Sequence, residues 1–190
     1  MTHRWLTIPI LLASFALAQA GSTDVAHVST PPRLADETTA VQPTLDQLLR
    51  LRAVLGGFEN VDDALAAGYA QSSACMSSAQ GGQGTHFASD ALIQAPSFDP
   101  SAPELPMYEV GTDGSFRPIA AEYLVCQQAR HDAGNAAAPA MLGREFSLNT
   151  TLLDEPFYAL RVWAWQDNPL GLFANRNPLV PCAAESAARR

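Results

Sequence analysis

The sequence predicts an α+β domain, in which an N-terminal pair of helices packs on a small antiparallel sheet or on a partly closed barrel. Apolar residues recur at helical spacing over residues 44–68, whereas they alternate along the chain from residue 105 onward. Helical patterns therefore precede strand patterns, which is typical of the α+β class. Residues 44–182 are expected to form a single domain, because they are numerous enough for one hydrophobic core.

Two helices are predicted at the start of this domain. Thr44 and Gln47 form the capping-box pattern that opens a helix, and a pair of glycines ends it. Asn60 is the expected N-cap of a second, shorter helix, which Gly68 ends. Leucines at helical spacing in the first helix indicate that the pair packs against the core.

Strand patterns follow in the second half of the chain. LPMYEV (105–110) and FRPIAAEYLV (116–125) predict two strands joined by a tight turn. Pro118 has no N–H, so the second strand is expected near an edge of the sheet or at a bulge. FYALRVWAW (157–165) is apolar on both faces, which indicates a central strand or one that closes a barrel.

The first twenty residues have the pattern of a secretory signal peptide. One arginine precedes an apolar run over residues 5–18 that is too short to span a bilayer, and residues 18–20 form a small-x-small cleavage pattern. Residues 21–43 are predicted to be a flexible linker and residues 183–190 a flexible tail. The protein is therefore expected to be secreted or periplasmic, without a membrane span once the signal is removed.

The stretch GGQGTHFASDALI, residues 81–93, contains the main candidate for a functional side chain, His86. It begins within a glycine-rich segment, 72–84, that is expected to be a loop, as is segment 127–141. No Lys-Ser or Lys-Thr follows the glycines and no Gly-x-Ser-x-Gly is present, so the stretch supports neither a phosphate-binding loop nor a nucleophile elbow. The glycines are instead expected to allow a tight turn that brings His86 close to another segment.

His86 belongs to three alternative sites. With Glu122 and Arg161 it forms the candidate set for binding a small ligand. With Asp90 and Glu122 it forms the candidate set for a divalent metal, because one imidazole and two carboxylates can hold such an ion. As a general base assisted by Glu122, it would serve a hydrolase or a lyase. No catalytic residue is assigned, because one histidine without a nucleophile does not make an active site, and the sequence requires no cofactor.

A structural role for the same residues is the competing interpretation. A buried His86 would be hydrogen-bonded within the fold, as buried polar groups generally are. Arg161 lies in an aromatic strand and is expected to pair with Glu122, because an unpaired guanidinium there carries a large desolvation cost. Stacking of Arg161 on Trp163 or Trp165 is the alternative.

The three cysteines allow at most one disulfide within the chain. Cys75 and Cys182 lie on either side of the strand-rich middle, so a bridge between them would tie the end of the domain to its helical start. Cys126 ends a predicted strand and would fit there as a small buried hydrophobe. No Cys-x-x-Cys pattern is present, so neither redox catalysis nor a structural zinc cluster is expected.

Seven short motifs occur in order between residues 58 and 182: ALAAGY, GTHF, LPMYEV, AEYLV, VWAW, NPLGLF and NPLVPC. Together they resemble an uncharacterised family of exported bacterial proteins. The resemblance implies that Cys75 pairs with Cys182 and that Cys126 is peculiar to this chain. It places His86 and Glu122 in recurrent motifs, and it implies that the residue before VWAW, Arg161, stands where relatives more often have histidine.

The composition further narrows the classes of function that the protein can have. The formal net charge is −8 and no basic stripe is present, so binding to nucleic acid is not expected. All eleven basic residues are arginine, which removes the Schiff-base chemistry and phosphate-loop contacts of lysine. The sequence thus favours an exported module that binds a small ligand or associates with the cell envelope, with metal binding and hydrolase or lyase activity as alternatives.

Overall fold

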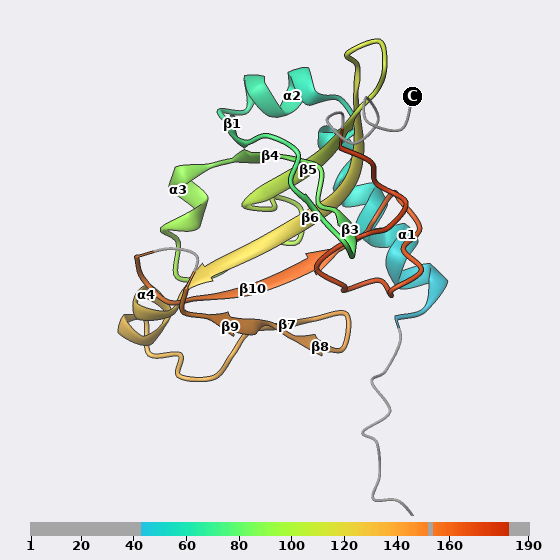
Figure 1. Ribbon diagram of the computed structural model, residues 1–190. Helices are drawn as coiled ribbons and strands as arrows, with labels where there is room; N and C mark the ends of the chain where they lie inside the picture. Colours follow the sequence, from blue (N-terminus) through green and yellow to red (C-terminus); the bar gives the residue numbers. More distant parts are fainter. Residues whose placement is uncertain (1–42, 152–153, 183–190) are drawn as a thin grey trace, which may run out of the picture. The chain divides into compact units, whose positions relative to one another are not determined.

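The computed structural model describes residues 43–151 and 154–182. The predicted signal peptide, residues 21–42 of the predicted linker and the predicted tail lie outside the described residues. Within the described part, six strands form one antiparallel sheet in the order β1-β4-β5-β6-β10-β9 (Figure 1). They are β1 (Ala70–Ser73), β4 (Thr85–Ala88), β5 (Leu105–Val110), β6 (Phe116–Cys126), β9 (Ser147–Asn149) and β10 (Phe157–Val162).

The α+β class is confirmed, and the sheet is open. β1 and β9 form its two edges and do not pair with each other, so the alternative of a partly closed barrel is wrong. Two short hairpins accompany the sheet: β2 (Ser77–Ser78) with β3 (Gly81–Gly82), and β7 (Ala140–Met141) with β8 (Arg144–Glu145).

The helices are short and are distributed along the described chain. α1 (Leu45–Val54), the 3₁₀ turn η1 (Gly56–Phe58) and α2 (Val61–Ala66) precede the strands, whereas α3 (Asp90–Ile93) and α4 (Gln127–Asp132) lie between them. In the described part of the chain no helix is long and apolar enough to cross a bilayer.

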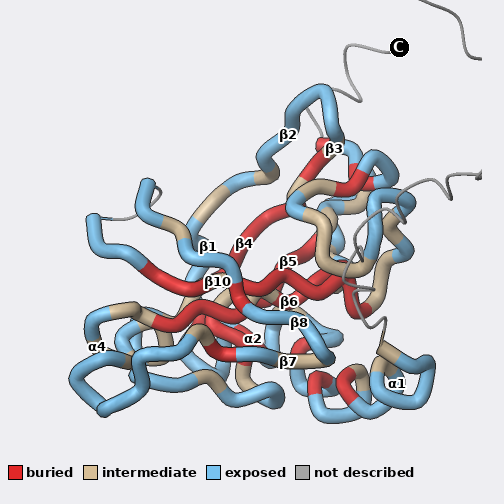
Figure 2. Tube along the Cα trace, turned by 90° about the horizontal axis from the view of Figure 1, so that it is seen from below, coloured by how far each residue is buried: buried red, intermediate tan, exposed pale blue. Residues whose placement is uncertain are grey.

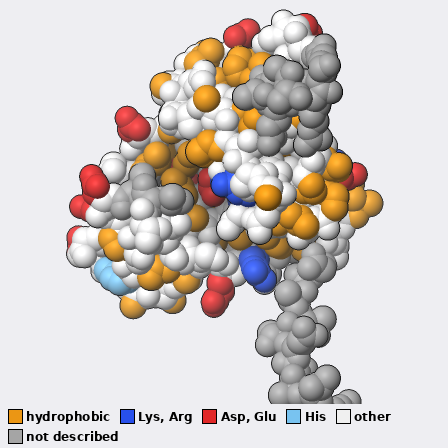
Figure 3. All heavy atoms as spheres, viewed as in Figure 1, with side chains coloured by type: hydrophobic (Ala, Val, Ile, Leu, Met, Phe, Trp, Pro, Cys, Tyr) orange, Lys and Arg blue, Asp and Glu red, His pale blue; other side chains and the backbone are white. Residues whose placement is uncertain are grey.

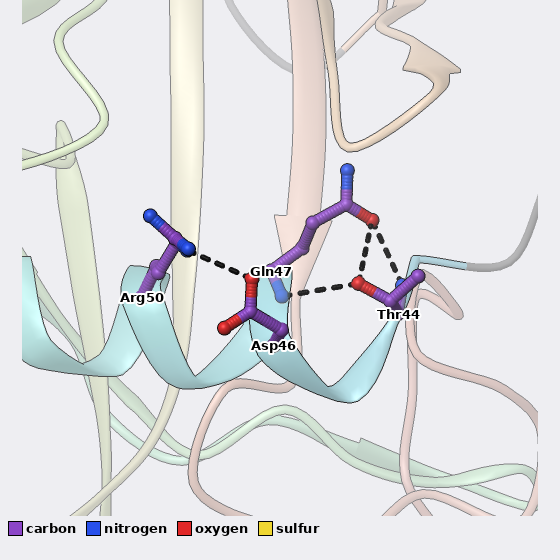
Figure 4. Close-up of polar contacts among 4 residues, drawn as sticks. All are labelled: Thr44, Asp46, Gln47 and Arg50. Carbon is purple, nitrogen blue, oxygen red and sulfur yellow. Dashed lines mark hydrogen bonds and ion pairs between the residues drawn. The ribbon is translucent and has the colours of Figure 1, made fainter.

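The start of α1 follows from its sequence. Thr44 Oγ1 accepts a hydrogen bond from the Gln47 N–H at 3.2 Å, and Gln47 Oε1 accepts one from the Thr44 N–H at 2.8 Å (Figure 4). These bonds satisfy N–H groups that the start of a helix otherwise leaves unpaired. Asp46 and Arg50, one turn apart, form an exposed ion pair at 2.8 Å on the same helix.

The predicted hairpin of two long strands is confirmed by β5 and β6. Tyr108 lies opposite Pro118, whereas Met107 lies opposite Ala120, so that Ile119 has no direct partner in β5. This is a bulge, and it explains how a proline occurs in a strand that has neighbours on both sides.

Two segments expected to be loops contain regular structure. Segment 72–84 includes the end of β1 and the hairpin of β2 with β3, whose strands are only two residues long. Segment 127–141 begins with α4, which contains good helix formers but no apolar stripe. Both elements are too short for periodicity to indicate them.

The main sheet has two faces of different chemistry. On the side that we call the apolar face, the rings of Phe87 and Tyr108 meet edge to face, with 5.3 Å between their centroids. Tyr123, Leu160 and Val162 extend this core, and residues of α1, η1 and α2 complete it: Leu51, Leu55, Phe58 and Ala64. Figure 2 shows that the buried residues are concentrated in the central strands β4, β5, β6 and β10.

Alternate residues of the same strands point to the opposite side, which we call the polar face. The C-terminal segment, residues 163–182, packs on this face and contributes Trp163 and Val180 to a small apolar cluster with Met107 and Ala120. The polar face also carries the residues singled out by the sequence: His86, Glu122 and Arg161.

Backbone contacts hold the C-terminal segment in place. Gly82 and Asn177 exchange hydrogen bonds between their N–H and carbonyl groups at 3.0 and 2.9 Å. A Cβ at Gly81 would overlap the Asn177 carbonyl, and a Cβ at Gly82 would overlap the Val180 carbonyl. The glycines of this stretch are therefore needed mainly for the close approach of a second chain segment.

The expected disulfide between Cys75 and Cys182 is confirmed. Its two Cα atoms are 5.5 Å apart, and it joins residues separated by 107 positions. Cys126 is a free, half-buried thiol at the end of β6. Disulfides are typical of proteins in oxidising compartments.

Candidate functional site

Arg161 and Glu122 form an ion pair on the polar face. They lie directly opposite each other in β10 and β6, and Arg161 Nη2 is 2.8 Å from Glu122 Oε2. The side chains are only 5% and 15% exposed. Arg161 Nη1 also donates to the Asn175 carbonyl. The predicted pairing is confirmed, and it ties two strands to the C-terminal segment that packs on them.

His86 lies within the sheet. It belongs to β4, opposite Met107 of β5 and Ser73 of β1, and is only 5% exposed. Burial lowers the pKa of its imidazole to about 4, and the Arg161 guanidinium adds to this shift while the Glu122 carboxylate opposes it. His86 is therefore neutral near pH 7. The sequence did not indicate a strand at His86, because the four-residue strand that holds it has too few residues to show alternation.

Three buried polar atoms near this cluster have no hydrogen-bond partner among the described residues. They are His86 Nε2, Arg161 Nε and Ser73 Oγ. Buried polar atoms are usually paired, so these atoms have hydrogen-bonding capacity that the described protein does not use. The structure thus brings the candidate ligand set of His86, Glu122 and Arg161 to one face of the sheet.

The candidate metal set is not brought together. Asp90 is an exposed residue at the start of α3, whereas His86 is buried in β4. Over residues 43–151 and 154–182, no group of three or more His, Cys, Asp or Glu side chains is placed to hold a metal ion. A pKa of about 4 also makes His86 a weak proton acceptor near neutral pH, which argues against general-base catalysis.

A cavity of about 360 Å³ that is open to solvent lies between α1 and the first part of the C-terminal segment. His86 and Glu122 are not among the residues that line it. Its lining combines apolar and polar side chains from two regions that are more than a hundred positions apart in the sequence: Leu48, Arg52, Trp163, Gln166, Asp167, Asn168, Pro169 and Leu172.

Hydrogen bonds within the C-terminal segment fix the wall of this cavity. The Trp163 N–H donates to the Leu172 carbonyl at 3.0 Å, and its indole Nε1 donates to the Ala174 carbonyl at 2.7 Å. Asn168 Oδ1 accepts the Leu170 N–H at 3.0 Å, as in the turns that asparagine forms with its own backbone. The wall is therefore held in shape by the protein itself.

Two charged side chains of the lining have no ion-pair partner among the described residues. Arg52 Nε donates to the Ala164 carbonyl, which holds the guanidinium at the cavity. The carboxylate of Asp167 is exposed, and its backbone carbonyl accepts a hydrogen bond from Asn177 at 2.8 Å. No ion pair joins Arg52 to Asp167. Both charges thus remain available to a ligand.

Sequence reasoning did not identify the cavity. Leu48 and Arg52 lie one turn apart on α1, which places a cation beside the apolar stripe of that helix. The tripeptide Asn-Pro-Leu occurs at both 168–170 and 177–179, and its first occurrence marks a turn in the opposite wall. Neither signal indicates that the two regions meet.

Glu104 is a buried carboxylate that the sequence also did not single out. It is 1% exposed, and its Oε2 accepts a hydrogen bond from the Leu124 N–H at 2.9 Å. The β5–β6 ladder ends at Leu105 and Glu122, so this carboxylate takes the place of the next strand carbonyl. Burial raises the pKa of Glu104 to about 7.

Comparisons of this chain with protein-family models, with curated proteins and with solved structures find no match. The family resemblance of the motifs therefore stays a prediction.

Proposed function

We propose that the protein is an exported module that binds a small ligand in the cavity between α1 and the C-terminal segment. The observation that carries this proposal is the composition of a cavity of about 360 Å³, a size typical of small-molecule sites. Its wall is held by internal hydrogen bonds, so little ordering is needed on binding. The signal-peptide pattern and the Cys75–Cys182 disulfide support export.

The polar face offers less to a ligand than the cavity does. The guanidinium of Arg161 already contacts Glu122 and the Asn175 carbonyl. Its role is to hold the C-terminal segment on the sheet. At the cavity, by contrast, Arg52 and Asp167 have no ion-pair partner within the described part of the chain, and apolar side chains line the same cavity.

A second candidate site is the set of His86, Glu122 and Arg161. The unpartnered atoms His86 Nε2 and Arg161 Nε favour it, because a small polar ligand there would satisfy both. The same experiment distinguishes the two sites.

The test is a fragment screen by NMR on protein labelled with ¹⁵N in its tryptophan and histidine side chains. Ligands of the cavity are expected to shift the indole N–H signal of Trp163, and filling the cavity with Leu172→Trp should abolish binding. Leu179→Trp is the matched control, because Leu179 lies in the same segment, is 50% exposed and does not line the cavity. Fragments that bind the Leu172→Trp variant unchanged, and that instead shift the ring signals of His86, would place the site on the polar face. A screen that yields no binder would refute the proposal.

A further inference from the structure

The ligand class can be inferred from the charges that line the cavity, and this inference rests on the proposed function. We propose that the cavity binds a free α-amino acid with an apolar side chain. Such a ligand carries one carboxylate and one ammonium group. The lining supplies one cation, Arg52, and one anion, Asp167, neither of which has an ion-pair partner in the described part of the chain.

Arg52 is arranged to take the carboxylate. Its Nε is held by the Ala164 carbonyl, so the guanidinium has a fixed position and its two terminal nitrogens remain for the ligand. A planar guanidinium binds a carboxylate through two parallel hydrogen bonds, which are stronger than bonds between neutral groups. The neighbouring cation of the same helix, Arg50, points elsewhere, because it is paired with Asp46.

Asp167 is arranged to take the ammonium group. It lies on the cavity wall formed by the C-terminal segment, and the hydrogen bond from Asn177 to its carbonyl fixes the backbone at this point. The adjacent Asn168 already uses its side-chain oxygen and nitrogen for the Leu170 N–H and the Arg176 carbonyl. Asp167 is therefore the anionic acceptor that this wall presents to a cationic group.

The remaining lining selects an apolar side chain. Leu48 and Leu172 present only hydrocarbon. Trp163 is only 2% exposed, and its indole N–H is bonded to the Ala174 carbonyl, so it adds apolar bulk behind the lining and no free donor. Contact with this lining removes apolar area from water, which stabilises an aliphatic or aromatic side chain in the cavity.

The net charge of the protein favours a zwitterion over an anion. With a formal net charge of −8, the protein repels a simple carboxylate at long range. A zwitterion has no net charge, so it approaches without this penalty and forms both ionic contacts on arrival. Figure 3 shows hydrophobic side chains gathered over α1. Three of the exposed apolar side chains of this helix are uncharged and do not repel a zwitterion: Leu45, Leu49 and Val54.

The test is calorimetry of residues 21–190, which leave out the predicted signal peptide, at pH 7 and low salt. The probes are L-leucine and L-phenylalanine, with 4-methylpentanoate and 3-methylbutylamine as leucine analogues that lack the ammonium or the carboxylate group. We expect at least one amino acid to bind, and each analogue of leucine to bind at least tenfold more weakly than leucine does.

Two variants assign the contacts. Arg52→Gln and Asp167→Asn should each weaken amino-acid binding at least tenfold, while Arg50→Gln and Asp132→Asn, which change exposed residues outside the lining, should leave it unchanged. Asp167→Asn alters an exposed side chain, so it remains informative if Arg52→Gln lowers stability.

The proposal of an apolar α-amino acid is wrong if neither amino acid binds or if 4-methylpentanoate binds as well as leucine. It is also wrong if the Asp167→Asn variant binds leucine as tightly as the wild type does. In each of these cases a fragment that shifts the Trp163 indole signal would leave the proposed function standing. If no fragment does so either, the cavity is not the binding site and both proposals fail.

Discussion

The two faces of the main sheet are covered in different ways. The apolar face belongs to a cluster of fifteen buried residues within the described part of the chain, to which α1, η1 and α2 contribute. The polar face has a cluster of only five described residues, and the segment that packs on it is held by a disulfide, a hydrogen bond from Arg161 to the Asn175 carbonyl and backbone contacts at two glycines. Stability on the apolar face is thus spread over many contacts, whereas on the polar face it depends on a few directional ones. The same few contacts position one wall of the proposed binding cavity.

The largest effect is expected from the disulfide. Replacing both Cys75 and Cys182 by serine should lower the free energy of unfolding by about 4–5 kcal/mol, because the bridge closes a loop of roughly a hundred residues. Urea denaturation measures the change. Cys126→Ser is the control and should have little effect, since Cys126 is free. An equal loss in the control, or recovery of Cys126 in a disulfide by peptide mapping, would contradict the assignment.

A loss of similar size is expected from breaking the ion pair. Arg161→Met leaves Glu122 buried without its partner, which should cost about 3–5 kcal/mol. Adding Glu122→Gln should restore part of the loss, and a double-mutant cycle measures this coupling. Arg117→Met is the matched control, because Arg117 pairs with Glu109 but is 66% exposed, so it should cost less than about 1 kcal/mol.

Amide hydrogen exchange sharpens the comparison for the same variant. In Arg161→Met, exchange should accelerate more at Val180, in the C-terminal segment, than at Tyr123, in the centre of β6. Equal acceleration at both amides would mean that the C-terminal segment and the sheet unfold together, and that Arg161 does not hold the segment separately.

The apolar face should respond in a different way. Leu55 is fully buried, so Leu55→Ala should lower the free energy of unfolding by about 2–5 kcal/mol. Leu55 packs in the large cluster of buried residues on the apolar face. Amide exchange should therefore accelerate throughout the domain in this variant. Leu49→Ala, on the exposed side of α1, is the control and should change stability little. Selective release of the C-terminal segment by Leu55→Ala would contradict the distinction between the faces.

The smallest effect concerns pH. Between about pH 4 and 6.5 the unfolded chain binds a proton at His86 that the folded protein does not, so stability falls as the pH falls through this range. Glu104 acts in the opposite sense: between 4.5 and about 7 the folded protein holds the extra proton, so stability falls as the pH rises. The two contributions oppose each other between pH 4.5 and 6.5.

Glu104→Gln removes one of these two contributions. The free energy of unfolding of this variant, relative to wild type, should rise with pH between 4.5 and 6.5 by up to about 1.4 kcal/mol per pH unit. Urea denaturation at several pH values measures the difference. Parallel pH profiles for the two proteins would show that folding does not raise the pKa of Glu104.

Much of the fold could be predicted where the signal is local. The capping box of Thr44, the hairpin of β5 with β6 and the pairing of Arg161 with Glu122 each follow from patterns within one or two elements. β4 and α4 were missed because four and six residues are too few for periodicity. Their positions depend on partners elsewhere in the chain.

The candidate site could be predicted only in part, for the same reason. His86, Glu122 and Arg161 stand out as polar residues in apolar surroundings, and the structure places them on one face. The cavity requires that Leu48 and Arg52 meet Trp163 and Leu172, and no local pattern records that contact. The close approach at Gly81 likewise follows from the position of a segment far along the chain.

A crystal structure of the protein soaked with L-leucine tests most directly whether the cavity binds the ligand and the polar face holds the C-terminal segment. We predict that the amino acid lies between α1 and the C-terminal segment, with its carboxylate at Arg52 and its ammonium group at Asp167, while the Arg161–Glu122 contact is unchanged. Leucine bound beside His86 and Arg161, with the cavity empty, would contradict the account. It would show that the cavity is not the binding site and that the polar face does more than hold the C-terminal segment.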